Sequence, residues 1–496
     1  MHGRPLHPDP SVAPPPPTRV PHSNGAPSSV GAASSTHALG TAVPQVTVDY
    51  KVARDIASQV AKQREELLKT KPDMDLASEE QRCLNWIAEA VALWSDAQAM
   101  TPQEDEALRR AIYDQLFRAG RLQPYLDDDR VEDIIIQGPH EVWLDYGDGG
   151  VRRKVGPIAE SEQELLELLR ELARGSGYNE RTISTANPTL ALSLQDGSRL
   201  QAITGLGPMT YAVIRRHRVS HAGLDDLVRL GTIDPILRDF LGACVRAEKN
   251  IMIAGKQKAG KTTLMRAMLK EFDPECRFAT IQTEDELFAH ANGYHRQVVS
   301  LVGRESNGEK DVTGRGAGEV TLLDLMHPAL RMSLERIVVG EVRGPEVVAM
   351  MQALTNGSGG NLCTIHARRP DIIFDRIAEL YALAQQNLSE QLAYRQTANG
   401  LDFIVYVDMT DETQIGGRRH RYVSHVLELT GIGENGRPAT NTIFSPGTEF
   451  GDLRAVPRMD PGCIDDLRRV GFDSALLQQP YGAWQAPLSL MVEVRR

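Results

Sequence analysis

The spacing of apolar residues predicts a group of helices ahead of any strand pattern. Apolar and charged residues alternate at helical spacing over Tyr50–Thr70, Leu84–Ala97 and Pro102–Ala119. Thr101 directly precedes the third segment, and Glu104 lies three residues after Thr101, which is the spacing of a capping box. We therefore expect a small helical module over residues 46–122, whose apolar stripes form its own core rather than a groove for a partner.

Short strands are predicted from residue 123 onward. Val131–Gln137 and Glu141–Leu144 flank Gly138-Pro139, a pattern typical of a hairpin. Further elements are expected at 161–173 (helix), 190–203 (strands broken by a turn at Asp196-Gly197) and 210–216 (strand). Residues 123–220 thus form a predicted α+β domain that ends in the basic cluster 215–218. In an acidic chain, one short basic cluster is more typical of a site for a local anion than of a nucleic-acid-binding surface.

Strands and helices alternate from residue 234, after an expected linker over residues 221–233. Apolar strands are expected at 250–254, 277–282 and 336–339, with helices at 235–247 and 263–270. Such runs between helices indicate a parallel sheet covered on both faces, hence an α/β fold. A helix at 372–385, a strand at 402–407 and a hairpin-like segment at 419–430 are expected to complete this domain, which we place at 234–435.

The two ends of the chain have different compositions. Ten of the 28 prolines lie in the first 44 residues, among Ser, Ala and Gly, without aromatic residues or periodicity. Such a segment buries too little surface to offset its ordering entropy, so residues 1–45 are expected to be a disordered, proline-rich tail. We favour a solvated leader over a docking tail. Residues 436–496 are expected to form a short appendage of strand and helix, with no chemistry assigned.

Composition narrows the class of protein. The 496 residues predict roughly three domains. The formal net charge of −11 argues against a surface built for duplex DNA. Five scattered cysteines without a C-x-x-C pair argue against a disulfide framework or a zinc site, and no apolar run reaches the length of a membrane span. We expect a cytoplasmic, multidomain protein.

A phosphate-binding loop is the strongest motif. Residues 255–262 fit G-x-x-x-x-G-K-[ST], with an apolar strand before the loop and a helix after it. In this pattern the backbone N–H groups and the helix N-terminus surround a phosphate, Lys261 reaches the β- and γ-phosphates, and the Thr262 hydroxyl ligates Mg²⁺. We expect ATP and Mg²⁺ as cofactors. The predicted nucleotide-binding residues are Gly255, Lys256, Gln257, Lys258, Ala259, Gly260, Lys261, Thr262 and Thr263.

A carboxylate at the end of a second strand strengthens this prediction. Arg336–Val339 is an apolar strand that leads to Glu341. An acid at the carboxyl end of a neighbouring strand can polarise water or hold Mg²⁺ beside the γ-phosphate. We therefore expect Glu341 to be catalytic.

Five further motifs accompany the phosphate loop along the chain. They are V-E-D-I with Q-G-P (131–139), D-G-S-R (196–199), I-R-R (214–216), L-R-M with R-I-V-V-G-E-V-R-G-P-E (330–346) and T-I-H-A (364–367). In this order, the six motifs resemble those of the type II/type IV secretion ATPases, and within them the Tad/Flp pilus assembly (CpaF/TadA-like) motors. The resemblance covers roughly 121–444.

The resemblance implies a RecA-like P-loop NTPase domain preceded by an α+β (PAS-like) domain. It implies a homo-hexameric motor at the cytoplasmic face of the inner membrane, which hydrolyses Mg-ATP to drive a membrane platform in pilus assembly or type II/IV secretion. By position, Arg199 and Arg215 would stabilise γ-phosphate charge, with Arg216 a competitor for that role. His366 would sense the γ-phosphate, and Glu286 would belong to the acidic box.

Two departures from the family pattern bear on hydrolysis. Gln282 and Thr283 stand where the acidic box has Glu and Asp, which leaves the acidic role to Glu286 or Glu284. Ser358 stands where the family has the first His of its His box. Because of these changes, an alternative function is that of a nucleotide-binding ring component with weak hydrolysis. A conjugation-type DNA-translocating ATPase is a further alternative, disfavoured by the acidic balance, and we expect no stable nucleic-acid binding.

Overall fold

The computed structural model of the chain describes residues 48–147, 152–175, 183–194, 196–216, 222–304, 316, 318–355, 359–384 and 388–492. The expected tail at 1–45, the substitution at Ser358 and the basic residues His217 and Arg218 lie outside these ranges. Within them, no helix is long and apolar enough to cross a bilayer.

The helical module consists of α1 (Tyr50–Thr70), α2 (Leu76–Gln98) and α3 (Pro102–Phe117). Its three helices are confirmed, and so is the capping box of Thr101 and Glu104. Helix α2 begins earlier than expected because the Asp75 side chain accepts a hydrogen bond from the Ser78 N–H and caps it. The stripes predicted as core are buried against one another, for example at Ile56, Ile87 and Ile112.

The α+β domain is built on an antiparallel sheet of order β3-β2-β1-β6-β5-β4. Its strands are β1 (Asp133–Gln137), β2 (Glu141–Asp145), β3 (Arg153–Val155), β4 (Thr189–Ser193), β5 (Arg199–Ile203) and β6 (Tyr211–Arg215). Two short helical turns, η1 (Gly120–Leu122) and α4 (Gln123–Leu126), precede it, and α5 (Glu162–Gly175) packs on one face through Leu165 and Leu169. Pairing of β1 with β6 places Asp133 opposite Arg215.

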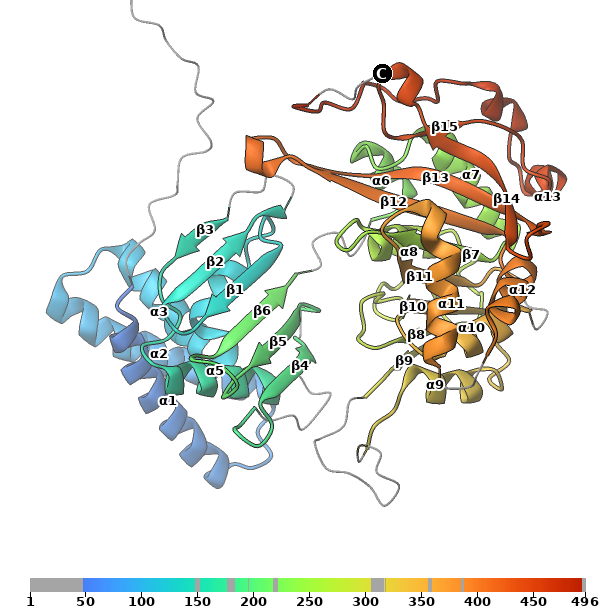
Figure 1. Cartoon of the computed structure of the whole chain (residues 1–496). Coiled ribbons are helices and arrows are strands. Elements are labelled where there is room, and N and C mark those ends of the chain that lie inside the picture. The colour runs from blue at the N-terminus through green and yellow to red at the C-terminus, as the bar shows by residue number, and fades with distance from the viewer. Residues whose placement is uncertain are drawn as a thin grey trace, which may run out of the picture. The chain divides into compact units, whose positions relative to one another are not determined.

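The second sheet has the order β15-β14-β13-β12-β7-β11-β10-β8-β9 and is parallel from β12 to β9 (Figure 1). Its parallel strands are β7 (Ile251–Gly255), β8 (Phe278–Gln282), β9 (Val298–Val302), β10 (Arg336–Val342), β11 (Leu362–His366) and β12 (Phe403–Asp411). The antiparallel strands β13 (Arg419–Ile432), β14 (Pro438–Pro446) and β15 (Ala455–Pro457) extend one edge. This confirms the expected α/β fold with a parallel sheet.

Helices cover both faces of this sheet. One core contains residues of α6 (Leu224–Arg229), α7 (Pro235–Arg246), α8 (Lys261–Leu269) and α13 (Ile464–Arg469). The other contains residues of α9 (Leu322–Ala329), α10 (Glu346–Thr355), α11 (Ile373–Leu383) and α12 (Glu390–Gly400). Strand β9 and helices α9, α10 and α12 were not expected from the sequence.

Three expectations differ from the structure at the C-terminal side. The segment 419–430 is not a hairpin but part of the single strand β13, which pairs with β12 and β14. Residues beyond 436 share the sheet and core of the preceding domain, with Phe444 and Leu467 buried. The segment expected as a linker contains α6, whose Leu227 is buried in the same core. The sequence boundaries at 233 and 435 therefore do not divide the core.

Candidate nucleotide site

The predicted phosphate loop joins the end of β7 to the start of α8. Gly260 (φ 99°) and Lys258 (φ 61°) adopt left-handed conformations that turn the chain into the helix. Gly255 lies so close to β12 that a Cβ there would be 2.2 Å from the Val407 carbonyl oxygen. The first turn of α8 has N–H groups without intrahelical partners and carries the positive end of the helix dipole. The loop thus has the backbone of an anion site.

Lys261 lies inside a cavity beside this loop. Its Nζ donates to the Lys256 carbonyl at 3.0 Å and lies 2.9 Å from His366 Nδ1. The residue is only 6% exposed, and this burial lowers the pKa of Lys261 to about 8. A desolvated ammonium gains more from a bound anion than a hydrated one does, so the position favours phosphate.

His366 connects Lys261 to Glu341. Its Nε2 lies 2.6 Å from Glu341 Oε1, and Arg343 pairs with Oε2 of the same carboxylate. Burial alone would raise the pKa of Glu341, but hydrogen bonds from His366 and Arg343 outweigh it and lower the pKa to about 2. Because Lys261 donates to Nδ1, these contacts assign the ring proton to Nε2. The start of α8 and the carboxyl ends of β11 and β10 thus carry one chain of close polar contacts.

The acidic box forms a second group of contacts. Glu286 Oε2 lies 3.4 Å from Thr262 Oγ1, and Glu286 Oε1 lies 3.3 Å from Arg199 Nη1. Arg199 Nε also pairs with Glu284. Buried Gln282 shapes this segment, because its Oε1 accepts the N–H groups of Glu286 and Leu287 at 2.9 Å each. Gln282 therefore positions the backbone that carries Glu286.

Asp133 joins Arg215 to the phosphate loop. Its Oδ1 accepts from Arg215 Nε at 3.0 Å, and its Oδ2 lies 2.6 Å from Lys258 Nζ. Burial would raise the pKa of Asp133, but the two cations lower it. Arg421 makes a parallel connection: its Nε donates to the Lys258 carbonyl at 2.9 Å, and its Nη2 lies 3.1 Å from both carboxylate oxygens of Glu132. Strand β1 and the residue before it thus hold the loop at two points.

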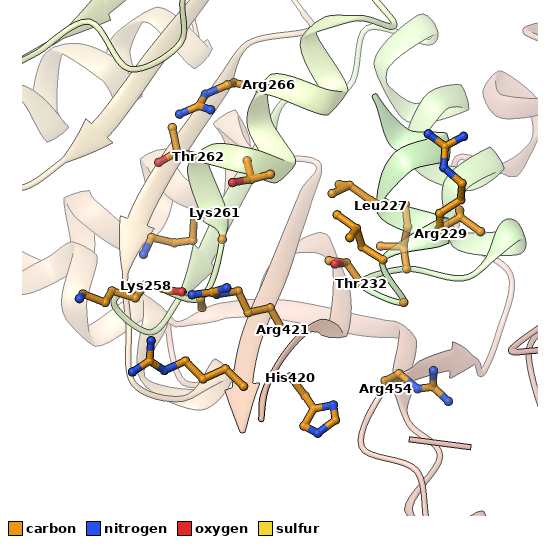
Figure 2. A pocket seen from close by; sticks show the side chains of 18 of the residues that line it. Leu227, Arg229, Thr232, Lys258, Lys261, Thr262, Arg266, His420, Arg421 and Arg454 are labelled. Atoms are coloured by element: carbon orange, nitrogen blue, oxygen red, sulfur yellow. The ribbon is translucent and has the colours of Figure 1, made fainter. Parts of the chain in front are cut away.

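The site residues predicted from sequence surround a common cavity of about 650 Å³ (Figure 2). Its lining includes the five predicted catalytic residues Glu341, Glu286, His366, Arg199 and Arg215, and the loop from Gln257 to Thr263. Gly255 and Lys256 are not among the lining residues; Lys256 Nζ instead pairs with Asp408 at 2.6 Å. Arg216 also lines the cavity, but its guanidinium is bonded to the Asp128 carbonyl.

Several arginines in the lining received no role from the sequence, and three of them are Arg343, Arg266 and Arg421. Arg343 follows Glu341 by two residues, and the period of a strand could have indicated that both point to one side. Arg266 follows Thr262 by one helical turn; its guanidinium lies 5.6 Å from the Phe288 ring centroid, and burial lowers the pKa of Arg266 to about 10. Arg421 is far along the chain from its partners, and no local pattern indicates it.

The residues present fit a nucleotide with Mg²⁺. The cavity volume lies within the range of small-molecule sites, about 300–1,000 Å³. Thr262 and Glu286 supply oxygen atoms, which Mg²⁺ prefers over nitrogen and sulfur. Among the described residues, no three His, Cys, Asp or Glu side chains form a group that could hold a metal ion. Mg²⁺ usually takes one or two protein oxygens together with phosphate oxygens and water, and Thr262 and Glu286 offer such oxygens.

Comparisons with known proteins cover most of this region. The sequence model of the family described as type II/IV secretion system protein matches residues 180–396. A protein of Mycobacterium tuberculosis, whose name assigns it provisionally to conjugal transfer, is 33% identical over 316 residues. These residues are 60% of this chain and 82% of that protein. The type IV secretion system protein PtlH of Bordetella pertussis is 28% identical over 332 residues, 62% of this chain and 93% of that protein. The X-ray structure of the Legionella pneumophila ATPase DotB aligns with a TM-score of 0.44 at 15% identity, covering 72% of this chain and 87% of that one.

Proposed function

The chain belongs to the type II/IV secretion system protein family, and on that premise we propose that it is a motor that hydrolyses Mg-ATP to power pilus assembly or type II/IV secretion. The observation that carries this proposal is the chain of close polar contacts from Lys261 through His366 to Glu341, beside the phosphate loop in one cavity. A buried ammonium, a ring that links it to a carboxylate and a helix N-terminus together suit phosphoryl transfer to water.

Each group has a role in this proposal. Lys261 and the first turn of α8 hold the β- and γ-phosphates, and Thr262 and Glu286 hold Mg²⁺. Mg²⁺ when bound supplies positive charge to phosphate oxygens. Arg199 and Arg215 balance the charge that develops at the γ-phosphate, after they leave their carboxylate partners.

Glu341 orients water rather than removing its proton in this arrangement. A carboxylate whose pKa is about 2 is a weak base at neutral pH. The ring nitrogens of His366 contact Lys261 through Nδ1 and Glu341 through Nε2. A movement of Lys261 towards phosphate removes the contact at Nδ1 and thereby changes the contact of Nε2 with Glu341. This link makes His366 the sensor of the γ-phosphate.

The proposed assembly is a homo-hexameric ring at the cytoplasmic face of the inner membrane, acting on an integral-membrane platform. The motifs of the Tad/Flp pilus motors support that subtype. The arginines of the site pair with carboxylates, which supports a role in nucleotide chemistry rather than stable nucleic-acid binding. Electron microscopy with a non-hydrolysable ATP analogue tests the ring, and a monomer under saturating analogue contradicts it.

The Lys261→Ala variant tests the hydrolysis. We expect turnover to fall by about 10²- to 10³-fold, because the variant loses a buried charge that faces the phosphates. The matched control is Lys69→Ala, which removes an exposed lysine paired with Glu65 on α1 and is expected to leave turnover unchanged. Hydrolysis by Lys261→Ala at the parent rate would refute the proposed function.

A second candidate function, nucleotide binding with slow turnover, has its own observation. Gln282 offers no carboxylate in the acidic box, and Glu341 is bonded to both Arg343 and His366. Such a protein would respond to nucleotide through conformation rather than through steady hydrolysis. Turnover above a few per minute per subunit, the low side of common enzyme rates, counts against this candidate.

A further inference from the structure

The two ends of the cavity have different chemistry. One end carries the phosphate-loop residues with Arg199 and Arg215. The other end is lined by residues 227–235 and 483–489, which include Leu227, Leu230, Trp484 and Leu488. Figure 2 shows Leu227 and Thr232 on one side of the view, and Lys258, Lys261 and Thr262 on the other. The second end also carries Arg229 and Arg454, but most apolar and aromatic side chains of the lining lie there, so we call it the apolar end. The cationic end matches a phosphate chain, and the apolar end matches a nucleoside.

The apolar end is closed by a C-terminal segment, residues 482–492, which we call the strap. Its first anchor is Asp234, the N-cap residue of α7. Oδ1 of this buried carboxylate accepts the Leu237 N–H at 2.8 Å, and Oδ2 accepts the Ala483 N–H at 2.7 Å. Gly482 is required at this contact, because a Cβ there would lie 2.8 Å from Asp234 Oδ2. One carboxylate therefore fixes both the start of a core helix and the start of the strap.

Two further anchors hold the rest of the strap. Arg454 Nη2 donates to the Ala486 carbonyl at 2.6 Å, and its guanidinium lies 4.0 Å from the Trp484 ring centroid. The Trp484 indole N–H donates to the Ala455 carbonyl at 3.0 Å. Glu412 accepts the N–H groups of residues 491 and 492 at 2.8 and 3.0 Å. Anchors on three separate elements place the strap in one position against the cavity.

We propose that the strap forms the binding surface for the base and ribose of the nucleotide, and that it sets the affinity for the nucleoside part. This inference rests on the proposed function. Trp484, Leu488 and the exposed Leu230 supply flat and aliphatic surface to the cavity. Stacking of a base on such surface increases affinity about 10- to 100-fold.

Calorimetry with two ligands tests the strap. ATP offers both phosphates and nucleoside, whereas inorganic tripolyphosphate offers phosphates alone. We compare a full-length chain, a chain ending at 481, which lacks the strap, and a control chain ending at 492, which keeps all three anchors. The chain ending at 481 is expected to bind ATP about 10- to 100-fold more weakly than the control and tripolyphosphate equally well. No loss for ATP, or an equal loss for both ligands by a folded protein, overturns the inference.

Trp484 fluorescence gives a second measurement that needs no truncation. In full-length protein with Trp86, Trp94 and Trp143 replaced by Phe, saturating ATP is expected to change the emission of Trp484, and saturating tripolyphosphate is expected to leave it unchanged. Identical responses to the two ligands, or no response to ATP, refute the role of the strap. Failure of the parent to bind tripolyphosphate at all would instead refute the proposed phosphate site, so the two failures are distinguishable.

Discussion

Replacing Asp133 by Asn is expected to destabilise the protein and also to tighten its binding of polyphosphate. The Asp133 side chain is 4% exposed and pairs with two cations, Arg215 at 3.0 Å and Lys258 at 2.6 Å. Lys258 has a left-handed backbone within the phosphate loop, and the ion pair helps to hold that conformation. The substitution keeps the size of the side chain and removes its charge, so it isolates the electrostatic contribution.

The two effects have opposite signs and separate magnitudes. Removing one partner of a buried ion pair costs about 3–5 kcal/mol when the other charge stays buried. Both cations here are about one-third exposed, so water offsets part of the loss and we expect about 2 kcal/mol, or a fall in Tm of about 4–8 °C. At an assumed separation of about 8 Å, a unit negative charge opposes the binding of an anion by about 1–2 kcal/mol at an effective dielectric of 20–40. Its removal predicts binding of tripolyphosphate roughly 5- to 30-fold tighter.

Differential scanning fluorimetry and calorimetry with tripolyphosphate measure the two effects on the same samples. Asp465→Asn is the matched control, because its exposed carboxylate pairs with Arg468 on the same helix, and neither quantity should change. The pKa of Asp133 is lowered in the folded protein, so its stabilising effect is present above the unfolded value and is lost as pH falls through the folded value. Weaker or unchanged tripolyphosphate binding by a folded Asp133→Asn protein would show that Asp133 does not compete with phosphate for these cations.

Three further predictions follow from other contacts. Burial lowers the pKa of Lys261 to about 8, and a bound polyphosphate should raise this pKa again. Binding at pH 8.5 should therefore be accompanied by uptake of roughly 0.7 proton, and Lys261→Met should not show this uptake. Calorimetry in two buffers of different ionisation enthalpy measures it. Without a ligand, Lys261 binds more protons in the unfolded chain than in the folded protein between pH 8 and 10.5. The free energy of unfolding therefore rises with pH across that window. Gln282→Ala leaves two buried N–H groups without their acceptor and should lower stability by about 2–4 kcal/mol in urea unfolding, with a large fall in hydrolysis. Gly255→Ala places a Cβ 2.2 Å from the Val407 carbonyl oxygen and should prevent recovery of folded protein, whereas Gly416→Ala, with open space, should cost about 1 kcal/mol by circular dichroism.

Local patterns predicted the elements that depend on neighbours in sequence. The capping box of Thr101 and Glu104 spans one helical turn, and the structure has it as predicted. The phosphate loop is similarly local, because strand, glycines and helix follow one another directly. By contrast, Asp133 contacts Lys258 across 125 residues, and neither residue type at its position indicates the other. Such pairs are determined by the way the chain folds back on itself.

The error at β13 has a physical cause. Within the segment expected to be hairpin-like, the polar residues Ser424 and His425 interrupt an apolar run. In the structure Ser424 is buried, and the register between β12 and β13 shifts at that point, where Val423 pairs with Val407 and His425 with Tyr406. The polar pair thus occupies a β-bulge within one strand, and a bulge has no sequence signal as strong as that of a two-residue turn.

The charge balance inside the cavity explains why the net charge of the chain was a poor guide to its ligand. Five carboxylates near the phosphate loop pair with cations, in the sets Glu132–Arg421, Asp133–Arg215–Lys258, Glu284–Arg199, Glu286–Arg199 and Glu341–Arg343. A polyphosphate therefore meets Lys261, which contacts a carbonyl and His366 rather than a carboxylate, and it gains these other cations by taking them from carboxylates. Binding is an exchange of partners, and its free energy is the difference between two sets of ion pairs. That is why neutralising one inner carboxylate should change phosphate affinity, whereas an equal change of charge on the surface, screened by water and salt, should not.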